Sequence, residues 1–190
     1  MARPLEFDRA EALSRATGAF WQDGYQHVSA AELAEAMGVA KSSLYNTFGS
    51  KRDLFIEAVG HFAEQQRAKI SKMATHANVV HQLREMLLDV ARHNECGRGC
   101  LLVNTATEIG ERDPVVNRQV QEGFDRLEQG ISELIRCGQA NGQIDPAIDP
   151  QRLAIILLAG IAGLRVLAQA GFSERRLMPV VDGLLRHLVP

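Results

Sequence analysis

The feature that most constrains this chain is the recurrence of apolar residues at helical spacing along almost its whole length. In one segment Val116, Val120, Leu127 and Ile131 fall on one helical face, and a similar stripe ends the chain. No alternation of apolar and polar residues runs long enough to predict a strand. We therefore expect an all-α protein with about nine helices.

Capping residues predict where many of these helices begin and end. Ser29 followed by Glu32 forms a capping box, as does Asp8 followed by Glu11, and Gly24 is suited to end a helix in a left-handed conformation. Asp-Pro pairs at 113–114 and 149–150 each place an N-cap before a proline at the first helical position. The predicted helices cover residues 8–24, 29–37, 41–48, 50–73, 83–90, 101–109 and 114–141, one from 150 onward and one over 178–188.

Composition excludes several classes of protein. The chain has 190 residues, 46% of them apolar and 23% charged, which is ordinary for a globular protein. Three cysteines are too few for a secreted disulfide framework. The N-terminus lacks an apolar leader, and the longest apolar run, residues 153–164, is shorter than the roughly 20 residues that cross a bilayer. We expect a cytoplasmic protein with no membrane partner.

Charge alone does not indicate a nucleic-acid-binding protein. The formal net charge is -2, and residues 1–60 carry 6 Lys+Arg against 8 Asp+Glu. Within residues 41–52, however, there are three cations (Lys41, Lys51 and Arg52) and no acid. DNA binding must therefore rest on where the charges are placed.

The segment from Val28 to Leu54 carries the functional information. Two short helices joined by a glycine-containing turn form a helix-turn-helix motif, whose second helix enters the major groove of DNA. Apolar residues such as Leu33 and Leu44 supply the buried faces, which leaves polar groups outside. We expect base contacts from Lys41, Ser42, Ser43 and Asn46, and phosphate contacts from Tyr45, Thr47, Lys51 and the helix N-terminus at Ser29.

Residues 18–55 resemble the DNA-binding domain of the TetR family of transcriptional repressors. The matching residues are Ala19-Phe20, Gly24-Tyr25, Ser29, Leu33-Ala34, Gly38-Val39, Leu44-Tyr45, Phe48, Ser50-Lys51 and Leu54-Phe55. The chain departs from the family pattern at Val28, Ala40 and Thr47. The resemblance implies a helix-turn-helix domain over residues 1–55, joined through a long helix to an effector-binding and dimerisation domain over 56–190. It also implies a homodimer that binds a palindromic DNA operator and is released by an unknown small-molecule inducer.

The stretch Gly99-Cys100-Leu101 resembles a family subgroup whose sixth helix lines the effector cavity. We expect ligand contacts from Cys100, Asn104, Thr107, Phe124 and Leu127. A thiol at a helix N-terminus beside Arg98 has a lowered pKa and can act as a sensor of electrophiles or oxidants, with Cys96 as a resolving thiol. The alternative is that Cys100 is a small buried apolar residue beside the cavity.

An enzyme interpretation finds few candidate residues. His93, Cys96 and Cys100 would share a helix face, but Gly97 and Gly99 interrupt that helix, and a fourth metal ligand is missing. We therefore expect no catalytic residue, no metal and no cofactor. The second hypothesis for function is a helical ligand-binding or thiol-based sensor protein that does not bind DNA.

The last two long helices are the candidate dimer interface. Residues 153–164 have no polar face, so a monomer would expose much apolar surface. Ala159, Gly160 and Gly163 would let a partner helix approach closely. The predicted interface residues are Leu157, Gly160, Ile161, Leu164, Leu184 and Leu188.

Overall fold

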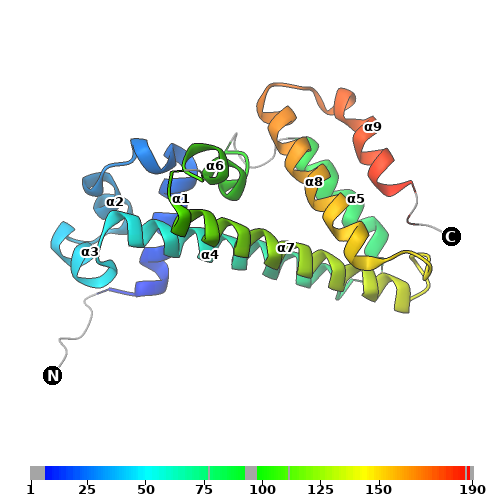
Figure 1. Ribbon diagram of the computed structural model, residues 1–190, viewed down its shortest axis with the longest axis horizontal. Helices are drawn as coiled ribbons and strands as arrows, with labels where there is room; N and C mark the ends of the chain where they lie inside the picture. Colours follow the sequence, from blue (N-terminus) through cyan, green and yellow to red (C-terminus); the bar gives the residue numbers. More distant parts are fainter. Residues whose placement is uncertain (1–6, 77, 93–97, 111, 187, 189–190) are drawn as a thin grey trace. The chain divides into compact units, whose positions relative to one another are not determined.

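The computed structural model describes residues 7–76, 78–92, 98–110, 112–186 and 188. These residues form nine α-helices and no strand, so the predicted all-α fold is confirmed (Figure 1). The helices are α1 (Arg9–His27), α2 (Ala30–Met37), α3 (Lys41–Phe48), α4 (Lys51–Met73), α5 (Val79–Ala91), α6 (Leu101–Glu108), α7 (Pro114–Ala140), α8 (Pro150–Gln169) and α9 (Glu174–Leu185).

The chain packs into two compact units that interleave along the sequence. The first unit contains Met1–Ala63 and Leu101–Gly123, and the second contains Glu64–Cys100 and Phe124–Pro190. Helices α4 and α7 therefore each contribute residues to both units, whereas α6 belongs to the first unit. The units are described separately below.

The helix starts follow local capping chemistry. The amide of Glu32 donates to Ser29 Oγ at 3.2 Å, and the amide of Ser29 donates to Glu32 Oε2 at 2.7 Å, which is the predicted capping box. Asp8 accepts from two first-turn amides of α1, but Glu11 pairs with Arg15 and does not complete a box. Asp-Pro pairs begin α7 and α8 as predicted.

Aromatic rings fix α1 against α4 in the first unit. The ring centroids of Phe20 and Phe55 lie 4.9 Å apart, edge to face, and Tyr25 lies 4.7 Å from Phe55. Trp21 of α1 meets Phe62 of α4 at 5.0 Å, so a further aromatic pair joins the two helices. Such aromatic pairs each add about 0.5–1.5 kcal/mol beyond the area they bury.

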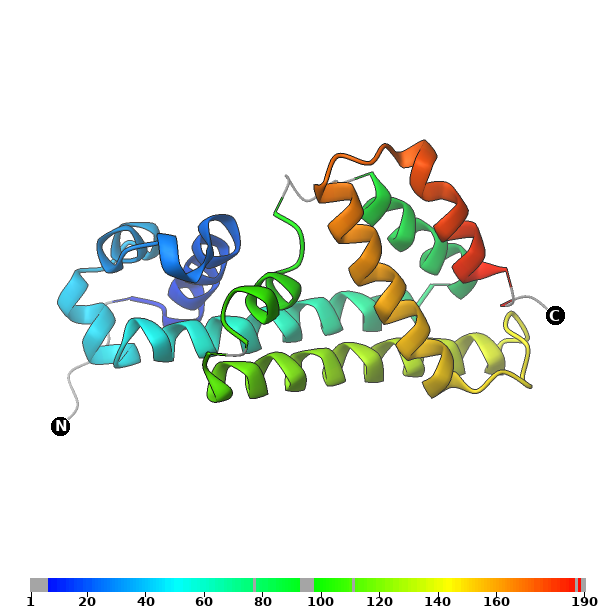
Figure 2. The same ribbon diagram turned by 45° about the horizontal axis from the view of Figure 1, so that its top comes forward.

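The second unit is built around α5, α8 and α9, which pack against one another (Figure 2). Buried Leu87 of α5, Leu164 of α8 and Leu177 and Val181 of α9 belong to one apolar core. Burying each such side chain stabilises the fold by about 1.5–3 kcal/mol. The core therefore fixes which faces of α8 and α9 remain outside.

Candidate nucleic-acid interface

One face of α3 is apolar and packs against α2. Leu44 and Phe48 are buried, as are Leu33, Ala34 and Met37 of α2, and the two helices are in contact across the turn at Gly38. Gly38 has a φ of 69°, a left-handed conformation that favours glycine. Close packing of two short helices at this turn is the geometry of a helix-turn-helix motif.

The opposite face of α3 is polar and open to solvent. Lys41, Ser42, Tyr45 and Asn46 are exposed, with Tyr45 at 40% exposure, and Ser43 and Thr47 are half-buried. Ala40, at the N-cap, makes no side-chain hydrogen bond, so the first-turn amides of α3 have no side-chain cap. Uncapped helix amides attract anions such as phosphate.

Lys51, at the start of α4, is positioned by Tyr25. Its Nζ lies 4.7 Å above the Tyr25 ring, a cation–π contact. Desolvation lowers the pKa of Lys51, and the nearby Glu108 and Glu32 carboxylates oppose this shift. The contact with Tyr25 thus orients the Lys51 ammonium group, which is predicted to bind a phosphate.

Ser29 and Arg52 differ in their availability to DNA. The Ser29 oxygen accepts the Glu32 amide, which leaves its O–H able to donate to a phosphate. Arg52, one of the three cations counted between residues 41 and 52, donates through Nε and Nη2 to both carboxylate oxygens of Asp113, at 2.6 and 2.7 Å. This ion pair neutralises Arg52 and removes it from the expected excess of positive charge.

Asp113 is stabilised in its charged form. The Arg52 guanidinium holds the pKa of the Asp113 carboxyl well below its usual range, assisted by the amides of Val116 and Val115. A group with a depressed folded-state pKa stabilises the protein above its unfolded pKa, and this contribution is lost as the pH falls.

We expect Asp113→Asn to lower the thermal stability at neutral pH, because the charge-assisted pair and part of the α7 cap are lost. The gap in Tm between parent and variant should narrow as the pH falls below about 4. There the Asp113 carboxyl of the unfolded parent takes up protons, while the folded parent keeps it charged until still lower pH. Circular dichroism melts across this range measure the effect. Asp125→Asn, at an exposed carboxylate, is the control, and a gap independent of pH would contradict the assignment.

The predicted ligand contacts fall in different surroundings. Cys100 is a free thiol, 8% exposed, immediately before α6, and Leu127 is also buried. Asn104 and Phe124 are half-buried, whereas Thr107 is exposed and donates its hydroxyl to carbonyls within α6. Asn104 and Thr107 belong to the first unit, and Cys100, Phe124 and Leu127 to the second. His93 and Cys96 lie outside the described residues.

Two buried hydroxyls were not singled out from the sequence. Thr105 Oγ1 and Ser132 Oγ are inaccessible to solvent and have no hydrogen-bond partner in the described part of the chain. An unsatisfied buried hydroxyl costs about 1–3 kcal/mol, so both groups would gain from a hydrogen-bond partner.

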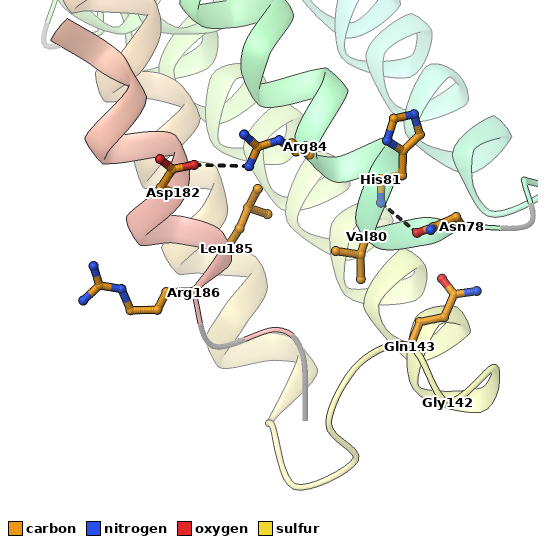
Figure 3. A pocket seen from close by; sticks show the side chains of 9 residues that line it. All are labelled: Asn78, Val80, His81, Arg84, Gly142, Gln143, Asp182, Leu185 and Arg186. Carbon is orange, nitrogen blue, oxygen red and sulfur yellow. Dashed lines mark hydrogen bonds and ion pairs between the residues drawn. The ribbon is translucent and has the colours of Figure 1, made fainter. Parts of the chain in front are cut away.

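A hollow of about 620 Å³ lies in the second unit, between the start of α5 and the end of α9 (Figure 3). Val80 and Leu185 form its apolar part, and Arg84 Nη1 lies 3.2 Å from Asp182 Oδ1 across it. None of the predicted ligand residues lines it. Most of its lining residues are exposed, so it would leave a ligand far wetter than sites that bury most of a ligand's surface.

The apolar face of α8 is rotated from the one predicted. Leu157, Leu164 and Leu188 are buried within the protomer, so they offer no surface to a partner. The space beside Gly160 is filled by Leu184 of the same chain, and Ile161 and Leu184 are half-buried. The large apolar residues of α8 that face solvent are Ile155, Ile156 and Val166, each 47–50% exposed. The protomer core therefore uses part of the face that the sequence assigned to the dimer.

Among the described residues, α8 is the one helix long and apolar enough to cross a membrane by length and composition. Such a helix is weak evidence of a membrane span, because core helices of soluble proteins and signal sequences can have the same length and composition.

The fold and the exposed polar face of α3 define a helix-turn-helix DNA-binding protein. A family model described as bacterial regulatory proteins, tetR family, matches residues 12–58, and one described as tetracyclin repressor-like, C-terminal domain, matches residues 77–180. The chain therefore belongs to the TetR family of transcriptional regulators.

Relatives and solved structures agree with this assignment. The uncharacterized HTH-type transcriptional regulator YezE of Bacillus subtilis (strain 168) is 30% identical over 190 residues, 96% of each chain. The HTH-type transcriptional repressor ComR of Escherichia coli (strain K12) is 28% identical and covers 97% of this chain and 90% of the relative. A cysteine mutant of the TetR family regulator CifR, complexed with 26bp operator DNA, is 31% identical, with a TM-score of 0.77 and coverage of 98% and 100%.

Proposed function

We propose that this protein is a repressor that binds a palindromic DNA operator as a homodimer and is released by a small-molecule inducer. In this proposal residues 1–55 bind DNA in the cytoplasm, and residues 56–190 bind the effector and form the dimer. The observation that carries it is the polar, solvent-facing surface of α3 backed by buried Leu44 and Phe48. The CifR relative bound to operator DNA supports it.

The contacts divide into two kinds. Lys41, Ser42, Ser43 and Asn46 lie toward the start and outer face of α3, where short donors and acceptors reach base edges. Phosphate contacts come from Ser29, Tyr45, Thr47 and Lys51, which orient the protein on the duplex.

A salt titration tests the DNA function. A duplex selected with the protein from a random-sequence library should bind with a logarithmic affinity that falls linearly with the logarithm of salt, by about 0.9 for each phosphate contacted. Fluorescence anisotropy measures the slope. An absence of any selectable duplex would contradict the proposal.

The homodimer uses the exposed face of α8. Ile155, Ile156 and Val166 line this face, and the exposed small residues Ala159 and Gly163 permit close approach of a partner helix. Val180 of α9 is exposed as well, so α8 and α9 of two copies can form a four-helix contact. A two-fold dimer would place its recognition helices about 34–36 Å apart, in successive major grooves. A partner protomer thus accounts for an apolar face that would otherwise meet water.

The proposed inducer site consists of the residues that the sequence predicts as ligand contacts. Cys100, Asn104, Thr107, Phe124 and Leu127 remain the proposed contacts. A mainly apolar inducer with at least one hydrogen-bonding group suits this set.

The burial of Cys100 favours its role as a small apolar residue over that of a reactive thiol. Membership of the Gly-Cys-Leu subgroup and sensing through Cys100 stay hypotheses. Mass spectrometry after brief exposure to a small electrophile would reject the sensor if Cys137 were labelled in preference to Cys100. A sensor without any DNA function is not supported, because the family consists of DNA-binding regulators.

A further inference from the structure

Helix α1 is broken three residues before it ends. Gly24 has a φ of 80° and a ψ of 166°, so the regular hydrogen-bonding pattern of the helix stops there. Amides just after such a break have no carbonyl partner one turn earlier and need another acceptor. The prediction that Gly24 ends the helix was right about the conformation, but the chain resumes a helical turn up to His27.

The acceptor comes from 83 residues away. The Tyr25 amide donates to Glu108 Oε2 at 3.4 Å, and the Gln26 amide donates to Glu108 Oε1 at 3.0 Å. One carboxylate thus serves two neighbouring amides, a geometry that suits an anion at the start of a helical turn.

Glu108 is poorly placed for its own helix. It is the last residue of α6, where a negative charge is unfavourable because it meets the negative end of the helix dipole. At the break in α1 the same carboxylate accepts hydrogen bonds from two amides, which is favourable. The contact to α1 therefore offsets a local conflict within α6, which favours a role for Glu108 outside α6.

The same carboxylate acts on the DNA-facing side of the first unit. Burial lowers the pKa of Lys51, and the charge of Glu108 acts against that lowering. The Nζ of Lys51 lies above the Tyr25 ring. The segment that Glu108 holds leads directly to Ser29, the N-cap of α2. One side chain of α6 therefore borders both the entry to the helix-turn-helix and a proposed phosphate contact.

We propose that Glu108 is a positioning residue, which fixes residues 24–28 and with them the placement of α2 and Lys51 for DNA binding. Any displacement of α6 that withdraws this carboxylate would release residues 24–28, the connector between α1 and α2. The proposal rests on the proposed function only for its DNA readout, because the contact itself can be tested in the free protein.

Hydrogen exchange in the free protein tests the contact. Glu108→Gln keeps one acceptor and removes the charge, so the amides of Tyr25 and Gln26 should exchange about tenfold faster. Glu108→Ala removes both acceptors and should have the larger effect. Asp23→Asn, at an exposed carboxylate beside the break, is the matched control and should leave both rates unchanged. Unchanged protection in Glu108→Ala would overturn the proposal.

Titration of the selected duplex tests the consequence for DNA binding. With protein concentrations corrected for the active fraction, Glu108→Gln should weaken binding about fivefold and Glu108→Ala more, whereas Asp23→Asn should match the parent. A merely structural role would lower Tm and the active fraction without changing the dissociation constant. Faster exchange with an unchanged dissociation constant would overturn the positioning role. Failure of the parent to bind any duplex would reject the proposed function, and the exchange rates would still decide whether Glu108 holds the connector.

Discussion

Ile156→Glu is expected to convert the proposed homodimer into a folded monomer and to reduce operator affinity by at least about a hundredfold. Ile156 is 48% exposed in the protomer and lies on the apolar face of α8. A two-fold interface would bury one new charge from each copy, and an unpaired buried charge costs several kcal/mol. A monomer presents one recognition helix and binds half a palindrome.

Sedimentation equilibrium and operator titration measure this effect. Val115→Glu is the matched control, because Val115 is also an exposed apolar residue, 51% exposed, but lies on α7 in the first unit. Leu157→Ala should instead change the stability of the protomer and not its assembly. Leu157 is fully buried in the protomer, so this change should lower the free energy of unfolding by about 2–5 kcal/mol. A dimeric Ile156→Glu protein would exclude this face of α8.

Lys41→Glu is expected to weaken binding to every duplex by about a hundredfold. Besides losing the proposed base contact, each half-site then receives a negative charge that repels the phosphates of any sequence. Lys41 is exposed at the first position of α3. Asn46→Ala should act differently, costing about 1–3 kcal/mol per half-site at one base pair and little elsewhere.

Anisotropy titrations on the selected duplex and on single-base variants separate the two effects. Lys72→Glu makes the same change of charge at the end of α4, in the second unit, and should cost much less. If Lys41→Glu and Lys72→Glu weaken binding equally, net charge and not the α3 surface governs the interaction.

The helices could be predicted because their signals are local. Ser29 with Glu32, and the Asp-Pro starts of α7 and α8, act within one helical turn, so residue spacing alone reveals them. The polar face of α3 follows from the same reasoning, since Leu44 and Phe48 must be buried together.

The remaining features depend on residues far apart in the chain. Arg52 and Asp113 are 61 positions apart, and Glu108 and Gln26 are 82 apart, so no spacing rule joins them. The burial of Leu157 and Leu164 within the protomer escaped the sequence for a related reason. The helix is apolar all round, and only the packing of α9, with Leu184 beside Gly160, decides which side is left for a partner.

The interleaving of the two units limits how this chain could exchange parts with a relative by recombination. A crossover placed after residue 63 would combine a DNA-binding head with a foreign α6 and a foreign start of α7. The head would then lose Asp113, which holds Arg52, and Glu108, which holds the amides of Tyr25 and Gln26. A chimera that keeps both contacts must carry residues 101–123 together with residues 1–63. This unit is therefore discontinuous in the gene although it is compact in space.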